Sequence, residues 1–183
     1  MVIEAYLALL RENPQVPTAA QVAERAGYSV RSVFERFPDL HALRLAATDH
    51  ALAQGNAHSL LTGVDGDRQS RLRAHVERRA HTCAEWLPLW RALLANKGDS
   101  EEIETRIRFV REATIKRIEL MYQAELSTLP ELESRRIVLA IEAIIDFESW
   151  ARMRNFFGLS PEEARAVWIG AIDSLLPPTP ADS

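Results

Sequence analysis

The chain has 183 residues, of which 47% are hydrophobic and 26% are charged, and its formal net charge is −4. This balance is typical of a globular protein with a substantial core, and no apolar run is long enough to span a bilayer, so we expect no membrane partner. The single cysteine, Cys83, excludes an intrachain disulfide. Because the N-terminus also lacks the pattern of a signal peptide, we expect a cytoplasmic protein.

The first 45 residues show the start and stop signals of short helices. A first helix is predicted over 2–12. Thr18 and Ser29 each precede a short helix, and their hydroxyls can accept a free backbone N–H at a helix start. Gly27 lies between these two helices and supplies the left-handed conformation that helix ends prefer. A fourth helix is predicted to begin after Asp39.

The rest of the chain is predicted to form longer helices. Their expected spans are 67–95, 100–126, 132–157 and 161–176. Pro88 is expected to break the first of them, because proline removes a helical donor and clashes with the preceding turn. Segments 55–66 and 96–99 are expected to be a loop and a turn. Strand-like alternation is absent from the sequence, so the predicted fold class is all-α.

The segment 18–37 carries the clearest functional pattern. Two short helices joined by a turn with glycine form the layout of a helix-turn-helix, whose second helix enters the major groove of DNA. Arg31 and Ser32 lie in the first turn of that helix, where arginine suits guanine or phosphate and serine can donate to either. The other interpretation is a plain helical hairpin in a bundle. Residues 1–55 hold five arginines, no lysine and six acidic residues, a net of −1, so overall charge does not favour DNA binding.

The residues from Thr18 to Asp39 strongly resemble the DNA-binding head of the TetR family of bacterial repressors. The matching positions are Thr18, Ala26, Gly27, Ser29, Phe34, Phe37 and Leu43. The resemblance implies a three-helix helix-turn-helix head over 1–45, a larger helical ligand-binding and dimerisation body over 46–176, and a flexible tail over 177–183. The residues expected to contact double-stranded DNA are Thr18, Tyr28, Ser29, Val30, Arg31, Ser32, Phe34, Arg36 and His41.

The head departs from the family's usual pattern at three positions. Phe34 stands where the family usually has tyrosine, so it cannot donate a hydroxyl to a phosphate. Arg36 replaces a frequent histidine and can hold a phosphate instead. Leu40 replaces a frequent lysine, for which the neighbouring His41 is a poor substitute. The basic arm that usually precedes the first helix is not in this sequence.

Two acidic residues lie four positions apart on the most apolar of the predicted helices. Buried acids are costly unless they are paired. Glu142 and Asp146 therefore either pair with arginines such as Arg117 or Arg152, or face a pocket as the polar anchor for a small-molecule effector with a cationic or donor group. Helical bundles commonly hold ligands between their helices in mostly apolar cavities. The expected apolar walls are Trp86, Trp90, Phe109, Tyr122 and Phe147.

The remaining expectations concern assembly and chemistry. The last two long helices are expected to pair with those of a second copy, because one of them is apolar on more faces than its own core needs. A glycine-rich phosphate loop is absent, and His75, His81 and Cys83 lack the spacing of metal ligands, so we expect no enzyme activity, no metal and no cofactor. The sequence predicts a ligand-responsive repressor that binds a palindromic operator as a homodimer. The alternative is a helical interaction or scaffold protein that kept the head but lost DNA binding.

Overall fold

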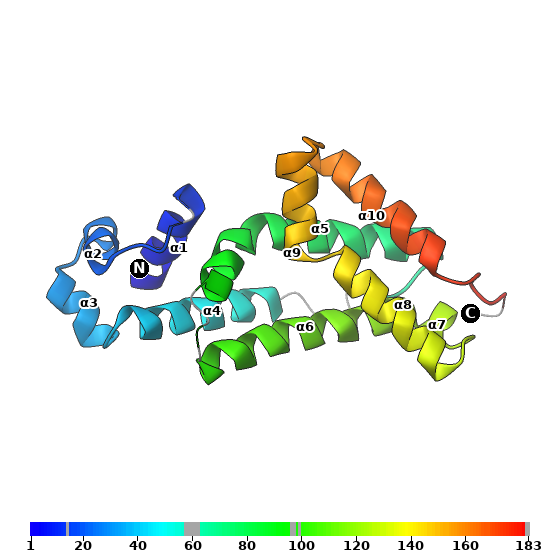
Figure 1. The fold of residues 1–183 in the computed structure, drawn as a ribbon, viewed down its shortest axis with the longest axis horizontal. Helices are drawn as coiled ribbons and strands as arrows, with labels where there is room; N and C mark the ends of the chain where they lie inside the picture. Colours follow the sequence, from blue (N-terminus) through cyan, green and yellow to red (C-terminus); the bar gives the residue numbers. More distant parts are fainter. Residues whose placement is uncertain (14, 57–62, 96–97, 99, 182–183) are drawn as a thin grey trace. The chain divides into compact units, whose positions relative to one another are not determined.

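The computed structural model describes residues 1–13, 15–56, 63–95, 98 and 100–181. Every regular element in these residues is a helix, which confirms the predicted all-α class (Figure 1). The chain forms two compact units, the first made of Met1–Ala57 and Pro88–Arg108, the second of His58–Leu87 and Phe109–Ser183. The helices α5 (Arg68–Ala95) and α6 (Glu101–Met121) therefore contribute residues to both units. The boundary at residue 45 between head and body stays a prediction about function.

Four helices come first in the chain and belong to the first unit. They are α1 (Val2–Glu12), α2 (Ala19–Ala26), α3 (Val30–Arg36) and α4 (Leu40–Asn56). α1 packs against α2 and α4, and α2 packs against α3. The core between them is formed by fully buried side chains that include Tyr6, Leu10, Val22, Val33 and Leu43.

Capping interactions define where α2 and α3 begin, as the sequence predicts. The Thr18 hydroxyl accepts a hydrogen bond from the N–H of Gln21 at 3.3 Å, and the Gln21 side chain accepts one from the N–H of Thr18 at 2.8 Å. This capping box satisfies two backbone donors at the start of α2. Gly27 ends α2 with a φ of 70°, a conformation that side chains disfavour. The Ser29 hydroxyl then accepts from the N–H of Ser32 at 3.1 Å and begins α3.

α5 runs through Pro88 without ending, so the predicted break at this residue is wrong. A proline removes only one helical donor, and α5 is anchored on each side of it by buried side chains, Cys83 in the second unit and Leu93 in the first. Pro88 is also the residue at which α5 passes from the second unit into the first.

The helix predicted over 100–126 is interrupted, whereas the last helix begins at its predicted residue. The predicted helix 100–126 is divided into α6 and the short helix α7 (Gln123–Leu126). The last helix, α10 (Pro161–Leu175), begins where it is predicted to begin. The Ser160 hydroxyl accepts from the N–H of Glu163 at 3.1 Å, and the Glu163 carboxylate accepts from the N–H of Ser160 at 2.7 Å.

The prediction of one continuous helix over 132–157 is wrong. Its three parts are α8 (Glu131–Ile144), α9 (Phe147–Ala151) and the π-helical segment η1 (Arg152–Phe156). Asp146 causes the interruption, because its carboxylate accepts a hydrogen bond from the N–H of Glu148 at 2.7 Å and so starts a new helix. The carbonyl of Ile145 accepts a hydrogen bond from Arg79 Nε at 2.8 Å, which satisfies a backbone acceptor that the break leaves open.

The segment expected to be a flexible tail is held at two points in its described part. The carbonyl of Pro177 accepts a hydrogen bond from Arg68. The Thr179 hydroxyl donates one to the carboxylate of Glu125 at 2.6 Å. These contacts attach the end of the chain to α5 and α7.

Two connections predicted from the sequence fall partly outside the described residues. Of the predicted loop over 55–66, residues 57–62 are not described, and of the predicted turn over 96–99, residues 96, 97 and 99 are not.

Among the helices that the structure does describe, none combines the length and the apolar character needed to cross a membrane.

Candidate DNA interface and effector site

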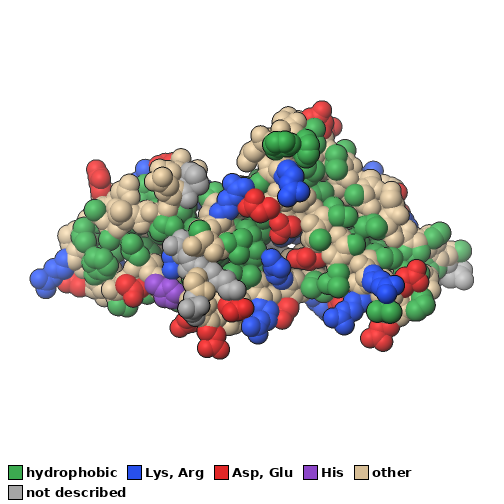
Figure 2. All heavy atoms as spheres, in the orientation of Figure 1, with side chains coloured by type: hydrophobic (Ala, Val, Ile, Leu, Met, Phe, Trp, Pro, Cys, Tyr) green, Lys and Arg blue, Asp and Glu red, His purple; other side chains and the backbone are tan. Residues whose placement is uncertain are grey.

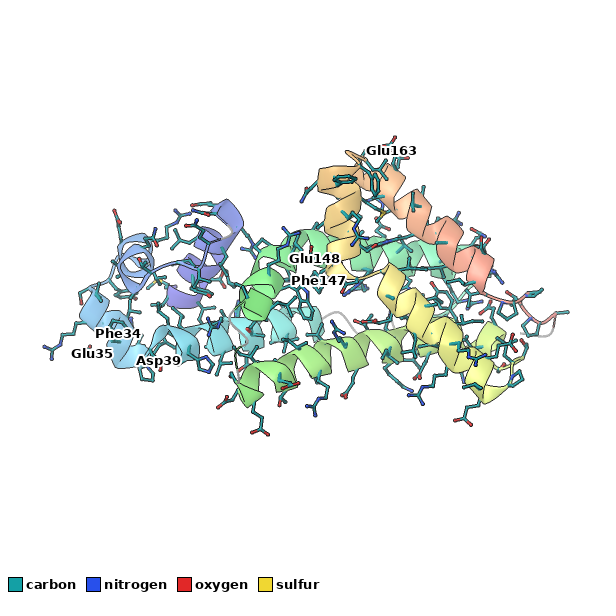
Figure 3. All side chains as sticks on the ribbon, viewed as in Figure 1. Phe34, Glu35, Asp39, Phe147, Glu148 and Glu163 are labelled. Atoms are coloured by element: carbon teal, nitrogen blue, oxygen red, sulfur yellow. The ribbon has the colours of Figure 1, made fainter. Side chains whose placement is uncertain are left out.

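The outer surface of α3 carries residues that the sequence predicts to read DNA. Val30 and Phe34 are 40% and 43% exposed, and the side chain of Arg31 is 89% exposed. Figure 2 shows hydrophobic and basic side chains next to one another at the surface over this helix, and Figure 3 labels Phe34 and Glu35 on it. The guanidinium of Arg31 donates a hydrogen bond to the Glu35 carboxylate at 3.0 Å. The exposed face thus combines two apolar side chains with an ion pair that stays within the helix.

The hydroxyls that the sequence predicts to contact DNA are engaged in helix capping. Thr18 caps α2, and Ser29 caps α3. The hydroxyls of Ser29 and Ser32 lie 2.9 Å apart and share a hydrogen bond at the start of α3. Each hydroxyl keeps further capacity, since such an oxygen donates one hydrogen bond and accepts two. Capping therefore fixes these side chains in place without excluding them from a DNA contact.

Tyr28 and Arg36 form a stacked pair at the edge of the helix-turn-helix. The guanidinium carbon of Arg36 lies 4.4 Å from the centroid of the Tyr28 ring, which is the geometry of a cation–π interaction. Stacking restricts the long arginine side chain and leaves its N–H groups at the rim available as donors. The pair lines a hollow of about 260 Å³ with residues of the first helix and the end of α3, which are Met1, Val2, Ile3 and Phe37.

Arg44, which the sequence reasoning missed, is tied to His41. Arg44 Nη2 lies 3.0 Å from His41 Nδ1, and because arginine only donates, Nδ1 accepts. A neutral imidazole in this arrangement carries its proton on Nε2, which can donate to another group. Arg44 is buried beside Tyr6. Burial raises the pKa of Tyr6, and the charge of Arg44 partly offsets this increase. The one sequence signal for the pair is its i, i+3 spacing, which puts both side chains on one helix face.

The aromatic residues predicted to line an effector pocket are distributed over both units. Trp90 belongs to the first unit, where it is buried, and the other four belong to the second. Within the second unit Tyr122 and Phe147 are buried and Trp86 is half-buried. Phe109 is 46% exposed on α6. Their common role as pocket walls stays a prediction.

A hollow of about 590 Å³ lies at the junction of α8 and α9, and both predicted anchors line it. The charged residues that line this hollow are Glu142, Asp146, Glu148, Arg111 and Arg152. Glu148 is labelled on α9 in Figure 3. The apolar part of the lining includes Ile144, Met153, Phe157, Val167 and Trp168. The five predicted aromatic walls are not part of this lining. Of the two arginines named as possible partners, Arg152 lines this hollow and Arg117 does not, and both alternatives stay predictions.

The second unit also contains a cluster of buried polar side chains that the sequence does not predict. Arg71 donates to the Glu125 carboxylate at 2.6 and 3.0 Å, and Thr179 donates to the same carboxylate. Next along α5, His75 Nδ1 lies 2.8 Å from the Tyr122 hydroxyl, and both side chains are buried. Burial lowers the pKa of His75 to about 3 and raises that of Tyr122 above its ordinary value. The histidine is therefore neutral near pH 7.

Comparison with known proteins gives likenesses in structure only. No protein-family model matches the sequence, and no curated protein does. A candidate transcriptional regulator from Pseudomonas aeruginosa PAO1 covers 95% of this chain and 88% of its own, with a TM-score of 0.68 and 21% identity. A candidate TetR-family transcriptional regulator from Rhodococcus sp. covers 96% of both chains, with a TM-score of 0.65 and 20% identity.

The chain therefore has the all-helical fold of the candidate TetR-family regulator from Rhodococcus sp., and this fold extends over nearly its whole length. The resemblance that residues 18–39 indicate is confirmed at the level of the fold. An identity near 20% shows the fold alone. Binding of DNA or of a ligand has to be argued from this chain's own residues.

Proposed function

We propose that the chain is a transcription regulator that binds a palindromic DNA operator as a homodimer in the cytoplasm. The observation that carries the proposal is the arrangement of α2 and α3, two capped short helices joined by a left-handed glycine. The outer side chains of the second helix are exposed, and a helix presented in this way fits the major groove. The fold shared with two candidate regulators supports the same conclusion.

The polar contacts to DNA are assigned by exposure and by donor geometry. Arg31 is our main candidate for reading a base, because its bond to Glu35 is exposed to solvent and such surface pairs contribute little. Arg36, held over the Tyr28 ring, supplies a phosphate contact. His41 supplies another through Nε2. The capping hydroxyls at the starts of α2 and α3 add neutral contacts to the DNA backbone.

Dimer formation is assigned to α8 and α10, which pack against each other. Both helices also carry exposed apolar side chains, and two more lie at the end of η1 and directly after it. The exposed residues are Leu132 and Leu139 on α8, Phe156 and Phe157 at η1, and Val167 on α10. Grouped apolar exposure is typical of a protein contact surface. Pairing these helices with those of a second copy gives an isologous four-helix bundle, and such a dimer carries two heads, one for each half-site of a palindrome.

We infer a small-molecule effector that binds the second unit and relieves repression. Glu142 and Asp146 lie together at one hollow, so a cationic or donor group on the effector is the chemistry that they favour. A ligand shifts DNA binding only if it binds one spacing of the two heads better than the other. α4 follows the helix-turn-helix directly in the chain and is the natural connection for such a shift.

One observation favours a second candidate function, an interaction protein that has lost DNA binding. Affinity for DNA depends on neutralising phosphates. In the head, however, Arg25 and Arg31 are each paired with a carboxylate, from Glu12 and Glu35 respectively. The acidic residues of the first 55 positions also outnumber the arginines.

Selection of bound sequences from a random pool of duplex DNA separates the two candidates. The expected result is an enriched palindrome with two half-sites. Arg31→Ala is expected to weaken binding to that palindrome by about 1–3 kcal/mol. Arg73→Ala removes an exposed arginine outside the head and is the matched control, with unchanged affinity. A pool with no enriched sequence would instead support the interaction protein.

A further inference from the structure

The two exposed apolar side chains of α3 stand one helical turn apart. Val30 and Phe34 are at positions i and i+4, so they lie on the same face of the helix. Val33 points away from this face and is buried in the core, so the fold does not need the outer two for packing. We call Val30 and Phe34 the apolar pair. In this seven-residue helix, they are exposed together with the polar side chains of Arg31, Glu35 and Arg36.

The polar groups beside the apolar pair also make hydrogen bonds within α3 and its N-cap. Arg31 donates to Glu35, and the hydroxyls of Ser29 and Ser32 bond to each other. The Glu35 carboxylate would be repelled by DNA phosphates, but its bond to Arg31 offsets that charge. Hydrogen-bond reading by this face rests on Arg31 and the capping hydroxyls, and the apolar pair adds a second kind of contact that only an apolar group on the DNA can meet.

We propose that Val30 and Phe34 read the 5-methyl groups of thymines in each operator half-site, an inference that rests on the proposed function. Among the four bases only thymine presents an apolar group in the major groove. A side chain that covers this methyl group removes apolar surface from water on both partners. A phenylalanine at position 34 lacks a hydroxyl for the DNA backbone, and its exposed ring suits this contact instead. The half-site should thus contain one or two thymines facing α3.

The test replaces single thymines of the selected operator with deoxyuridine, which removes the methyl group and keeps the base pair. Loss of one buried methyl group is expected to weaken binding about fourfold. This effect should appear at one or two thymines of each half-site and at none of the thymines outside them. Phe34→Ala or Val30→Ala should weaken binding to the thymine operator and remove the effect of uracil at the corresponding position.

Two further variants serve as controls for the contact between the apolar pair and thymine. Phe34→Tyr keeps the ring and should keep the sensitivity to uracil. Both residues of the apolar pair are exposed, so their replacement is expected to leave the helical content unchanged, which circular dichroism checks. Arg73→Ala should leave the affinity and the sensitivity to uracil unchanged.

The outcomes separate this inference from the function on which it rests. If the chain binds an operator tightly but no uracil substitution weakens the complex, the methyl-reading role is wrong and DNA binding stands. Equal losses for the thymine and uracil operators in Phe34→Ala and Val30→Ala would overturn it in the same way. If no operator is recovered, both conclusions fail.

Discussion

The guanidinium of Arg71 donates hydrogen bonds of 2.6 and 3.0 Å to the two carboxylate oxygens of Glu125, and both side chains are buried. Thr179, near the end of the chain, donates to the same carboxylate at 2.6 Å. Burial by itself raises the pKa of Glu125, but the hydrogen bonds from Arg71 and Thr179 outweigh it and hold the pKa below its ordinary value. The ion pair thus joins α5, α7 and the last segment of the chain while remaining charged.

Breaking this ion pair is expected to destabilise the protein strongly. Glu125→Gln leaves the Arg71 charge buried without its partner, which typically costs about 3–5 kcal/mol. Urea unfolding followed by circular dichroism measures the loss. Glu112→Gln removes an exposed carboxylate of α6 and is expected to change stability by less than about 0.5 kcal/mol. A Glu125→Gln variant as stable as the parent would show that the pair is not what holds these segments together.

The buried imidazole of His75 should make stability depend on pH. Burial, with the charges of Arg117 and Arg79, lowers the pKa of His75 from 6.5 to about 3. The unfolded chain has the ordinary value, so below pH 6.5 the unfolded state binds a proton that the native state does not. The free energy of unfolding therefore falls as the pH decreases toward 3. Between pH 7 and pH 5, protonation of this residue in the unfolded chain is expected to lower the free energy of unfolding by about 2 kcal/mol.

A variant without a titrating group checks that assignment. His75→Gln retains a hydrogen-bonding side chain opposite Tyr122. Between pH 7 and pH 5 the free energy of unfolding of this variant should fall by about 2 kcal/mol less than that of the parent. His81→Gln, at an exposed position of the same helix, should keep the pH dependence of the parent. Denaturant titrations at several pH values supply the curves. Parallel curves for the parent and His75→Gln would contradict a neutral buried histidine.

The head was predicted well because its signals are local. Thr18, Gly27 and Ser29 each act through backbone groups no more than a few residues away, and the structure finds each in the predicted capping role. Asp146 shows the limit of the same reasoning. An acid in an apolar run fits a buried charge and a helix cap equally well, and only the hydrogen bond to Glu148 distinguishes them.

The buried cluster of the second unit could not be predicted for a different reason. Arg71 and Glu125 are 54 positions apart, and no periodicity relates residues on different helices. The available signal was that Arg71 and His75 fall one turn apart beside Leu72 and Val76, on the stripe of α5 that becomes buried. A polar residue at such a position indicates that a partner exists without naming it.

The capping role of Asp146 can be separated from a role in ligand binding. Asparagine caps helices as well as aspartate does, whereas alanine does not. Asp146→Asn should therefore leave thermal stability nearly unchanged, and Asp146→Ala should cost about 1 kcal/mol. Cationic amphipathic compounds that raise the melting temperature of the parent should raise that of Asp146→Asn less. Equal shifts in the parent, Asp146→Asn and Glu142→Gln would remove the anchor role from both acids.

The thiol of Cys83 should be unreactive in the folded protein. Burial raises its pKa to about 11, and the thiolate is the reactive form. At pH 8 a disulfide reagent such as Ellman's reagent is therefore expected to label the native chain only as fast as it unfolds. The same reagent in denaturant should label one thiol per chain at once, which serves as the control. Rapid full labelling of the native protein would show that the segment of α5 around Cys83 opens locally.

The apolar outer surface of α8 and α10 predicts how the chain associates. Leu139 and Val167 are 46% and 51% exposed on two helices that pack together, so a second copy that covers them would bury both. Leu139→Glu or Val167→Glu would place a carboxylate in that contact, and each is expected to weaken association about 10- to 100-fold. Phe109→Glu, at a similarly exposed apolar residue of α6, is the control and should leave association unchanged. Analytical ultracentrifugation at micromolar concentration measures the dimer. A monomeric parent would contradict the dimer itself, and equal association in all three variants would place the contact elsewhere.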